Sequence, residues 1–302
     1  MTRPYVLGLE VVLADGRVLR TGGRCHKNKT GFDLIGSFVG SEGLLGVVTQ
    51  ATLRIIPHPP ARAMLSVSFP DFAEAARAVD TILGSGFLPA ALEITDKFTL
   101  QAARDYKGAD AVPDGLAHVL VELDGHADSV ALETVALEKL LREKRDVVQL
   151  ETADSEAACE ALWDLRRAFS YSLRATGLTK LNEDVVVPRG RLCELVAFCE
   201  SLQADSGFPV ACFGHAGDGN IHVNIMVDAI DDAATRERSE AALDRLFMEV
   251  LRLGGAITGE HGVGIAKKRW IGDALGAVAM DVHRTLKSAL DPKGILNPGK
   301  FV

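Results

Sequence analysis

The chain has 302 residues, of which 47% are hydrophobic, so it is long enough to bury a sizeable core as one large domain or two modest ones. Its formal net charge of -8 gives no general attraction for nucleic acid or for an anionic membrane, so no nucleic-acid partner is expected. The sequence contains no run of about 18 apolar residues, and no membrane-spanning helix is expected either.

The first 57 residues predict a small β-rich segment. A strand is expected at residues 6–13, a hairpin turn at Asp15-Gly16, and the partner strand at residues 18–21. A glycine-punctuated stretch follows, and a further strand is expected at residues 50–56. Pro57, Pro59 and Pro60 then close the segment as a stiff linker.

Strands and helices alternate from the linker to the end of the chain. The predicted strands are residues 64–69, 90–94, 118–123, 147–150, 181–187, 210–215 and 221–227. The predicted helices are residues 71–83, 96–105, 129–144, 155–175, 191–205, 233–253 and 274–290. This order predicts an α+β domain with helices on one face of a mainly antiparallel sheet, close to two ferredoxin-like units.

Five cysteines are present, and no two are spaced as a Cys-x-x-Cys motif. An odd number of thiols without such a motif is typical of a chain kept in a reducing compartment. The N-terminal residues show neither an apolar signal core nor a basic amphipathic pattern. We therefore expect a cytoplasmic protein, and peripheral association at the inner face of the membrane stays open.

The strongest motif is FGHAGDGNIHVN at residues 213–224, in which two predicted strands flank a glycine turn. The glycines allow positive φ, so His215 and His222 are expected opposite each other near the end of the hairpin. Asn224 follows His222 by two residues and shares its face of the strand. Two neutral imidazoles in this arrangement suit a zinc-like cation, although a histidine in a strand is more often a half-buried structural residue.

The second motif is GEHGVG at residues 259–264, which places Glu260 and His261 side by side in a glycine-rich loop. Glu260 would add a hard oxygen ligand to the two histidines, and such a set leaves metal positions open for substrate oxygens or water. His261 would then be available as a base beside the metal. A solvated Glu-His pair is the alternative interpretation of the motif taken alone.

The third motif is GSEGLLGVVT at residues 40–49, directly before a predicted strand. Its small residues let the backbone pass close to a flat or anionic ligand, to which backbone N–H groups can bond. Considered by itself, this motif is better explained as a plain turn.

Together and in this order, the three motifs resemble the FAD-linked 2-hydroxy-acid oxidases and dehydrogenases. That family includes cytochrome-type D-lactate dehydrogenases, D-2-hydroxyglutarate dehydrogenases and the flavin subunit of glycolate oxidase. The stretch DPKGILNPGK at residues 291–300 adds to the resemblance, which runs from about residue 5 to residue 302. It implies an FAD-binding domain of the vanillyl-alcohol-oxidase type, of which residues 1–57 are the second half. Residues 58–273 would form a ferredoxin-like α+β cap or substrate domain with the metal site, and residues 274–302 a helix and loop that return to the FAD domain.

The resemblance also assigns roles to individual residues. The expected ligands of a divalent metal, zinc or manganese, are His215, His222 and Glu260, and His261 is the expected catalytic base. The expected substrate-binding residues are Arg166, Ser170, Lys180, Asn224 and His261. Arg166 lies in the stretch Trp-Asp-Leu-Arg, and its guanidinium group fits a carboxylate at two points. The expected FAD-binding residues are Ser41, Glu42, Gly43, Gly46, Thr49 and Asn297.

The activity implied is oxidation of a small D-2-hydroxy acid (D-lactate, glycolate or D-2-hydroxyglutarate) to the 2-keto acid. Hydride would pass to FAD, and electrons would leave to a quinone, a cytochrome or an electron-transfer flavoprotein. The glycine-rich loop that holds the FAD pyrophosphate in the family would precede residue 5, and no such run occurs here. We therefore expect that FAD binding needs a separate segment or subunit, and a homodimer is also open.

Two other hypotheses stay open at this point. The first is a truncated or split, non-catalytic remnant or subunit that keeps the metal site but needs a partner for FAD. The second is a metallohydrolase with the same three ligands. The motif at residues 40–49 argues against the second, because hydrolysis has no use for a flavin-binding surface.

Overall fold

The computed structural model describes residues 2–302, which form two compact units. One unit comprises the residues up to 58 together with residues 260–302, and the other comprises residues 59–259. The second boundary falls at residues 259/260 rather than after residue 273, because the loop that follows residue 260 packs with the N-terminal segment. Glu42 shows this directly, since its carboxylate accepts hydrogen bonds of 2.8 Å from the backbone N–H groups of Val263 and Gly264.

The unit that contains both chain ends is built on a three-stranded antiparallel sheet with the order β2-β1-β3. Its elements are β1 (Val6–Val12), β2 (Val18–Gly22), α1 (Leu34–Phe38), β3 (Val47–Leu53) and α8 (Ile271–Leu290). Leu9, Val11 and Phe38 form its buried cluster. The predicted hairpin is confirmed, and the third strand is present but begins and ends three residues earlier than predicted.

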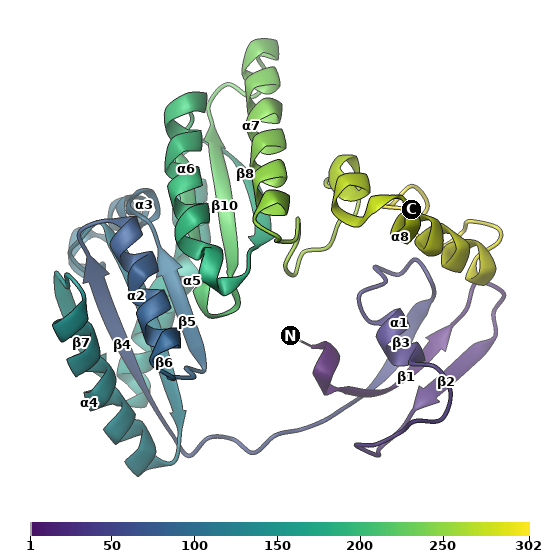
Figure 1. The fold of residues 1–302 in the computed structure, drawn as a ribbon, viewed down its shortest axis with the longest axis horizontal. Coiled ribbons are helices and arrows are strands. Elements are labelled where there is room, and N and C mark those ends of the chain that lie inside the picture. Colours follow the sequence, from purple (N-terminus) through teal and green to yellow (C-terminus); the bar gives the residue numbers. More distant parts are fainter. Residues whose placement is uncertain (1) are drawn as a thin grey trace. The chain divides into compact units, whose positions relative to one another are not determined.

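The other unit is a seven-stranded sheet with the order β7-β4-β6-β5-β9-β10-β8, in which every pair is antiparallel. Its strands are β4 (Ala61–Phe69), β5 (Ala91–Thr95), β6 (Ala117–Gly125), β7 (Gln149–Ala153), β8 (Thr179–Val186), β9 (Val210–His215) and β10 (Asn220–Val227). Its helices are α2 (Phe72–Gly84), α3 (Lys97–Lys107), α4 (Ala127–Lys144), α5 (Glu156–Ala175), α6 (Leu192–Ser206) and α7 (Ala233–Arg252). Figure 1 shows the elements of each unit.

Two ferredoxin-like halves make up the seven-stranded sheet, as the sequence predicts. The first half runs β4-α2-β5, then β6-α4-β7, and its spatial order is β7-β4-β6-β5. The second half runs β8-α6-β9, then β10-α7, with the spatial order β9-β10-β8. The two halves join edge to edge where β5 pairs with β9.

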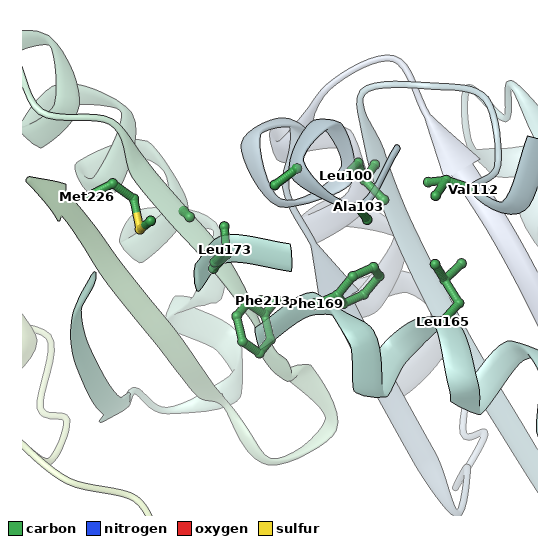
Figure 2. Packing of buried hydrophobic residues seen from close by; sticks show 10 residues of the cluster. Leu100, Ala103, Val112, Leu165, Phe169, Leu173, Phe213 and Met226 are labelled. Atoms are coloured by element: carbon green, nitrogen blue, oxygen red, sulfur yellow. The ribbon is translucent and has the colours of Figure 1, made fainter. Parts of the chain in front are cut away.

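Helices cover both faces of this sheet, whereas the sequence predicted one covered face. On one face, α3 and α5 pack against β9 through a buried cluster that includes Leu100, Phe169 and Phe213 (Figure 2). On the other face, Cys212 contacts Cys199 of α6, because neighbouring residues of a strand point to opposite sides. Helices α3 and α5 are additions to the ferredoxin-like pattern. They pack on the face of the sheet toward which the side chains of Phe213 and Met226 point.

Several helices begin at the residues that the sequence indicates. Asp71 caps α2 by accepting a hydrogen bond of 2.6 Å from the backbone N–H of Glu74, and Asp96 caps α3 in the same way. No helix within residues 2–302 has both the length and the apolar character that crossing a bilayer requires.

Candidate active site

The β9–β10 hairpin places two histidines on one face of the sheet. His215 pairs with Asn220 across the hairpin, and His222 pairs with Phe213. The two histidines are therefore diagonal neighbours and not directly opposite, as the sequence had suggested. Their ring centroids are 5.6 Å apart, with the ring planes at 79°. The turn between the strands depends on Gly219, which has a φ of 75° and whose absent Cβ would lie 2.1 Å from the carbonyl oxygen of Val187.

Glu260 completes the predicted set of metal ligands. It follows Gly259, the last residue of the seven-stranded unit, by one peptide bond. One ligand atom from each of His215, His222 and Glu260 lies within 4.8 Å of the other two. The three residues that the sequence identified as ligands are thus brought together.

A buried carboxylate, Asp184 of β8, fixes the chain just before Glu260. Asp184 accepts a hydrogen bond of 2.8 Å from the backbone N–H of Gly259 and one of 3.0 Å from Oγ1 of Thr258. It also accepts a hydrogen bond of 2.6 Å from Nδ2 of Asn220 and is the strand partner of His222. The same carboxylate therefore holds both the histidine hairpin and the loop that carries Glu260.

A second buried carboxylate, Glu93 of β5, lies beside His215. The two residues are direct strand partners, and Oε1 of Glu93 is 2.6 Å from Nδ1 of His215. Oε2 accepts a hydrogen bond of 2.6 Å from Nε of Arg166, and Glu93 is only 3% exposed. Burial alone would raise the pKa of Glu93, but its contacts with His215 and Arg166 outweigh burial and lower the pKa.

The predicted substrate-binding residues Arg166 and Ser170 lie one turn apart on α5. The guanidinium carbon of Arg166 lies 4.9 Å from the centre of the Phe213 ring. Ser170 Oγ accepts a hydrogen bond of 3.0 Å from Nζ of Lys180 on β8. Burial, with a smaller contribution from the positive charge of Arg174, lowers the pKa of Lys180.

Asn224 and His261 differ in exposure. Asn224 is fully buried and donates hydrogen bonds of 3.0 Å from Nδ2 to the carbonyl oxygens of Ala211 and His222. Its Oδ1 is buried and has no hydrogen-bond partner among the described residues. His261 is half-exposed, and its Nε2 lies 3.8 Å from a carboxylate oxygen of Glu260.

Two of the expected FAD-binding stretches meet in the three-stranded unit. Nδ2 of Asn297 donates a hydrogen bond to the carbonyl oxygen of Glu42. Gly43 has a φ of 71°, and a Cβ there would lie 2.8 Å from Nδ2 of Asn297, so this approach needs glycine. Ser41 borders a cavity of about 260 Å³ in the same unit.

The other two residues of this set have contacts with β1. Gly46 packs closely on that strand, because a Cβ would lie 2.5 Å from Cγ1 of Val11. Thr49 Oγ1 donates a hydrogen bond of 2.9 Å to a carboxylate oxygen of Glu10. Both residues therefore have structural roles in addition to the roles predicted for them.

Reasoning from sequence missed Glu93 and Asp184. Glu93 is the one acid of its predicted strand, and Asp184 follows Glu183 in another. A charged residue is almost never fully buried unless it is paired. That signal marks a buried ion pair but does not identify the partner. One partner of Glu93, His215, lies 122 residues away along the chain, across the junction of the two halves.

Comparison with known proteins places the chain among flavin-linked oxidases. It is 38% identical over 301 residues to glycolate oxidase subunit GlcD of Bacillus subtilis, covering all of this chain and 64% of that protein. It is 33% identical to a probable mitochondrial D-lactate dehydrogenase of Danio rerio, covering 99% of this chain and 61% of that protein. The chain thus spans less than two thirds of the length of these relatives.

Solved structures confirm the expected fold class. P-cresol methylhydroxylase with substrate bound matches with a TM-score of 0.75 at 20% identity, over 98% of this chain and 65% of that one. A 4-ethylphenol oxidase from Gulosibacter chungangensis matches with a TM-score of 0.74 over the same shares. A family model described as FAD linked oxidases, C-terminal domain, matches residues 58–301. The chain therefore belongs to the FAD linked oxidases and carries their C-terminal domain.

Proposed function

We propose that the chain provides the metal-binding and substrate-binding part of an FAD-linked enzyme that oxidises a small 2-hydroxy acid to the 2-keto acid. The observation that carries this proposal is the convergence of His215, His222 and Glu260 beside a buried Glu93–Arg166 pair. Relatives named glycolate oxidase subunit and D-lactate dehydrogenase support a glycolate-like or D-lactate-like substrate. A subunit name among the relatives also supports a partner subunit.

The residues present fit a divalent cation such as zinc or manganese. Two imidazoles and a carboxylate are a common donor set for such ions, and they leave positions open for other oxygens. Bonds of about 2.0–2.2 Å require ligand atoms within about 4.4 Å of one another, so the observed limit of 4.8 Å asks only for small side-chain movements. His215, His222 and Glu260 would hold the ion.

Arg166 and Lys180 would bind the substrate carboxylate. Only Nε of Arg166 donates to a protein acceptor among the described residues, so both Nη groups are available for a two-point contact with a carboxylate. Lys180 is half-buried, and its hydrogen bond to Ser170 keeps the ammonium group on the same face as α5. This pair of cations suits an anionic substrate that carries a carboxylate.

His261 would accept the proton of the substrate hydroxyl group. Its position next to Glu260 in the chain keeps a half-exposed imidazole beside the proposed metal ligands. A bound divalent cation supplies a Lewis acid for substrate oxygens, and bound FAD supplies the two-electron acceptor. Buried Asn224 presents an amide oxygen that has no partner in the described part of the chain, which suits a hydrogen-bond donor of the substrate or of a water molecule.

FAD would contact the turn at residues 40–43 and the loop around Asn297. The backbone at this turn is open to a ligand, because Gly40 has a φ of 88° and no other atom lies within 4 Å of the position that a Cβ would take. Ser41, Glu42, Gly43, Gly46, Thr49 and Asn297 are the proposed contacts. A separate FAD-binding segment or subunit would complete the pocket, and a quinone, a cytochrome or an electron-transfer flavoprotein would take the electrons.

The direct test uses the full chain reconstituted with FAD, together with a separate FAD-binding segment if uptake requires one. We expect glycolate or D-lactate to bleach the flavin absorbance without oxygen, and dialysis against a chelator to prevent the bleaching. An FAD-loaded, metal-loaded preparation that neither acid reduces would contradict the proposal.

A matched pair of variants tests the role of Arg166. Arg166→Lys removes the planar fork, and we expect the KM for the acid to rise about 10–100-fold because a two-point contact is lost. Arg167→Lys is the control, because Arg167 is exposed and bonds Glu160 and Asp164 on the outer side of α5. Equal KM values for the two variants would show that Arg166 does not bind the substrate carboxylate.

A further inference from the structure

We infer that Glu93 is a positioning residue whose single carboxylate sets both the metal-binding histidine His215 and the substrate-binding arginine Arg166. This inference rests on the proposed function. It adds a residue that none of the three motifs contains. The two oxygens of Glu93 are divided between two partners, each at 2.6 Å. A change at Glu93 therefore affects the metal ligand and the arginine together.

The first contact selects the nitrogen of His215 that can bind a cation. A neutral imidazole carries one N–H and one lone pair, and the carboxylate of Glu93 can only accept. Nδ1 of His215 must then carry the proton, which leaves the lone pair on Nε2. Carboxylates that accept from a metal-binding histidine in this way fix its orientation and make it a stronger ligand.

The second contact holds the guanidinium group of Arg166 from one side. Glu93 uses Nε, and Phe213 lies under the planar group at 4.9 Å. The two contacts restrict the rotamers of a long side chain that would otherwise lose much freedom on binding substrate. The two Nη groups of Arg166 are therefore already oriented before a substrate carboxylate binds.

Burial distinguishes Glu93 from an ordinary surface ion pair. Its side chain is 4% exposed and that of Arg166 is 12% exposed, so water screens their attraction poorly. Glu93 also borders a cavity of about 490 Å³, together with His215 and Trp163. A small carboxylate from solution could therefore reach the position of the Glu93 side chain once that side chain is removed.

The experiment compares Glu93→Ala and Glu93→Gln with Glu74→Ala in the full chain. Glu74 is a matched control, because it is also buried and its carboxylate also has two side-chain partners, Arg77 and Arg145. The first readout is the affinity for Co²⁺, measured by titration without FAD. We expect Glu93→Ala to weaken it about 10–100-fold, as is typical for loss of an outer-shell partner, and Glu74→Ala to leave it unchanged.

Glu93→Gln separates the two contacts. Its amide oxygen can still accept from Nδ1 of His215, but its NH₂ group then faces Nε–H of Arg166, donor against donor. We expect Co²⁺ affinity within about threefold of wild type, while the KM for the acid in the FAD-loaded protein rises about tenfold at nearly unchanged kcat. This split is not what a general loss of packing would give.

Two further readouts report on positioning directly. Nitrogen NMR of the metal-free chain, labelled at histidine, should show Nδ1 of His215 protonated in wild type and a shift toward the other tautomer in Glu93→Ala. Formate should restore part of the Co²⁺ affinity of Glu93→Ala and should leave wild type unchanged.

The outcomes separate this inference from the proposed function. If wild type binds Co²⁺ and oxidises the acid while Glu93→Ala matches Glu74→Ala in both, the positioning role is wrong and the proposed function stands. If wild type binds no Co²⁺ at all, both the proposed metal site and the positioning role of Glu93 are wrong. Loss of affinity in Glu93→Ala with an unchanged His215 tautomer would also overturn the inference.

Discussion

The two ferredoxin-like halves of the seven-stranded sheet differ at their fourth strand. In the first half, β7 pairs with β4 over five residues, from Met64 with Ala153 to Ser68 with Gln149. In the second half, the corresponding edge has, among residues 2–302, one isolated bridge, between Val186 and Ala256. The same topology therefore ends in a regular strand on one side and in a loop on the other.

That difference explains how Glu260 reaches the histidines. Gly255 lets the chain approach β8, because a Cβ there would lie 2.2 Å from the carbonyl oxygen of Val186. After the bridge, Asp184 binds Thr258 and Gly259 in place of the strand ladder that β7 makes in the first half. A shortened edge strand therefore leaves a glycine-rich loop that can carry a metal ligand.

Each half also buries a histidine on its third strand, and the two histidines have different surroundings. His118 of β6 lies 2.8 Å from the hydroxyl oxygen of Ser66, and burial lowers its pKa to about 4. His222 of β10 has His215 and Glu260 within metal-binding reach. Burial of a histidine is therefore shared by both halves, whereas a converging donor set is found in the second.

The largest effect is expected when a proposed metal ligand in the second half is removed. His222→Ala removes one of three ligands, so we expect Zn²⁺ or Mn²⁺ affinity to fall at least about 100-fold, more than loss of an outer-shell partner costs. His118→Gln should bind the metal as wild type does. Calorimetric titration of both variants measures the difference, and equal affinities would show that the ion binds elsewhere.

The next effect concerns His118 and the pH dependence of stability. The unfolded histidine becomes protonated below about pH 6.5, whereas the folded one stays neutral down to about pH 4. The contribution of His118 to the free energy of unfolding is therefore fully present above pH 6.5. About 3 kcal/mol of that contribution is lost as the pH falls toward 4. Denaturant unfolding should show that His118→Gln loses about that much less than wild type over this range, and parallel curves would contradict the assignment.

The smallest expected effect concerns the substitute for the fourth strand. Asp184→Asn cannot accept from all three donors of its present contacts, so the loop before Glu260 becomes less well fixed. We expect metal affinity to fall about 10-fold, as for other outer-shell changes. Asp96→Asn is the control, because that cap lies at the start of α3 and keeps an acceptor for Thr99. An unchanged affinity in Asp184→Asn would mean that Glu260 is positioned without this carboxylate.

Much of this arrangement could be predicted from residue patterns alone. The alternation of strands and helices predicted both ferredoxin-like halves, and the glycines around His215, His222 and Glu260 indicated a ligand-binding backbone. These signals are local, because each lies within one hairpin or one loop.

Long-range pairings could not be predicted in the same way. Glu93 meets His215 only because β5 and β9 form the junction between the halves, and no local pattern sets that register. The additional helices α3 and α5 have ordinary amphipathic sequences, so their position on the second face of the sheet was not evident. The strand pairing of His222 with Phe213 likewise made the two histidines diagonal neighbours.

We propose above that one divalent ion binds to His215, His222 and Glu260. Crystals of the full chain grown with zinc and measured at the zinc absorption edge test it most directly. We expect one strong anomalous peak within bonding distance of Nε2 of His215, a ring nitrogen of His222 and a carboxylate oxygen of Glu260. Zinc bound in stoichiometric amount at other residues, with no peak among these three, would contradict it.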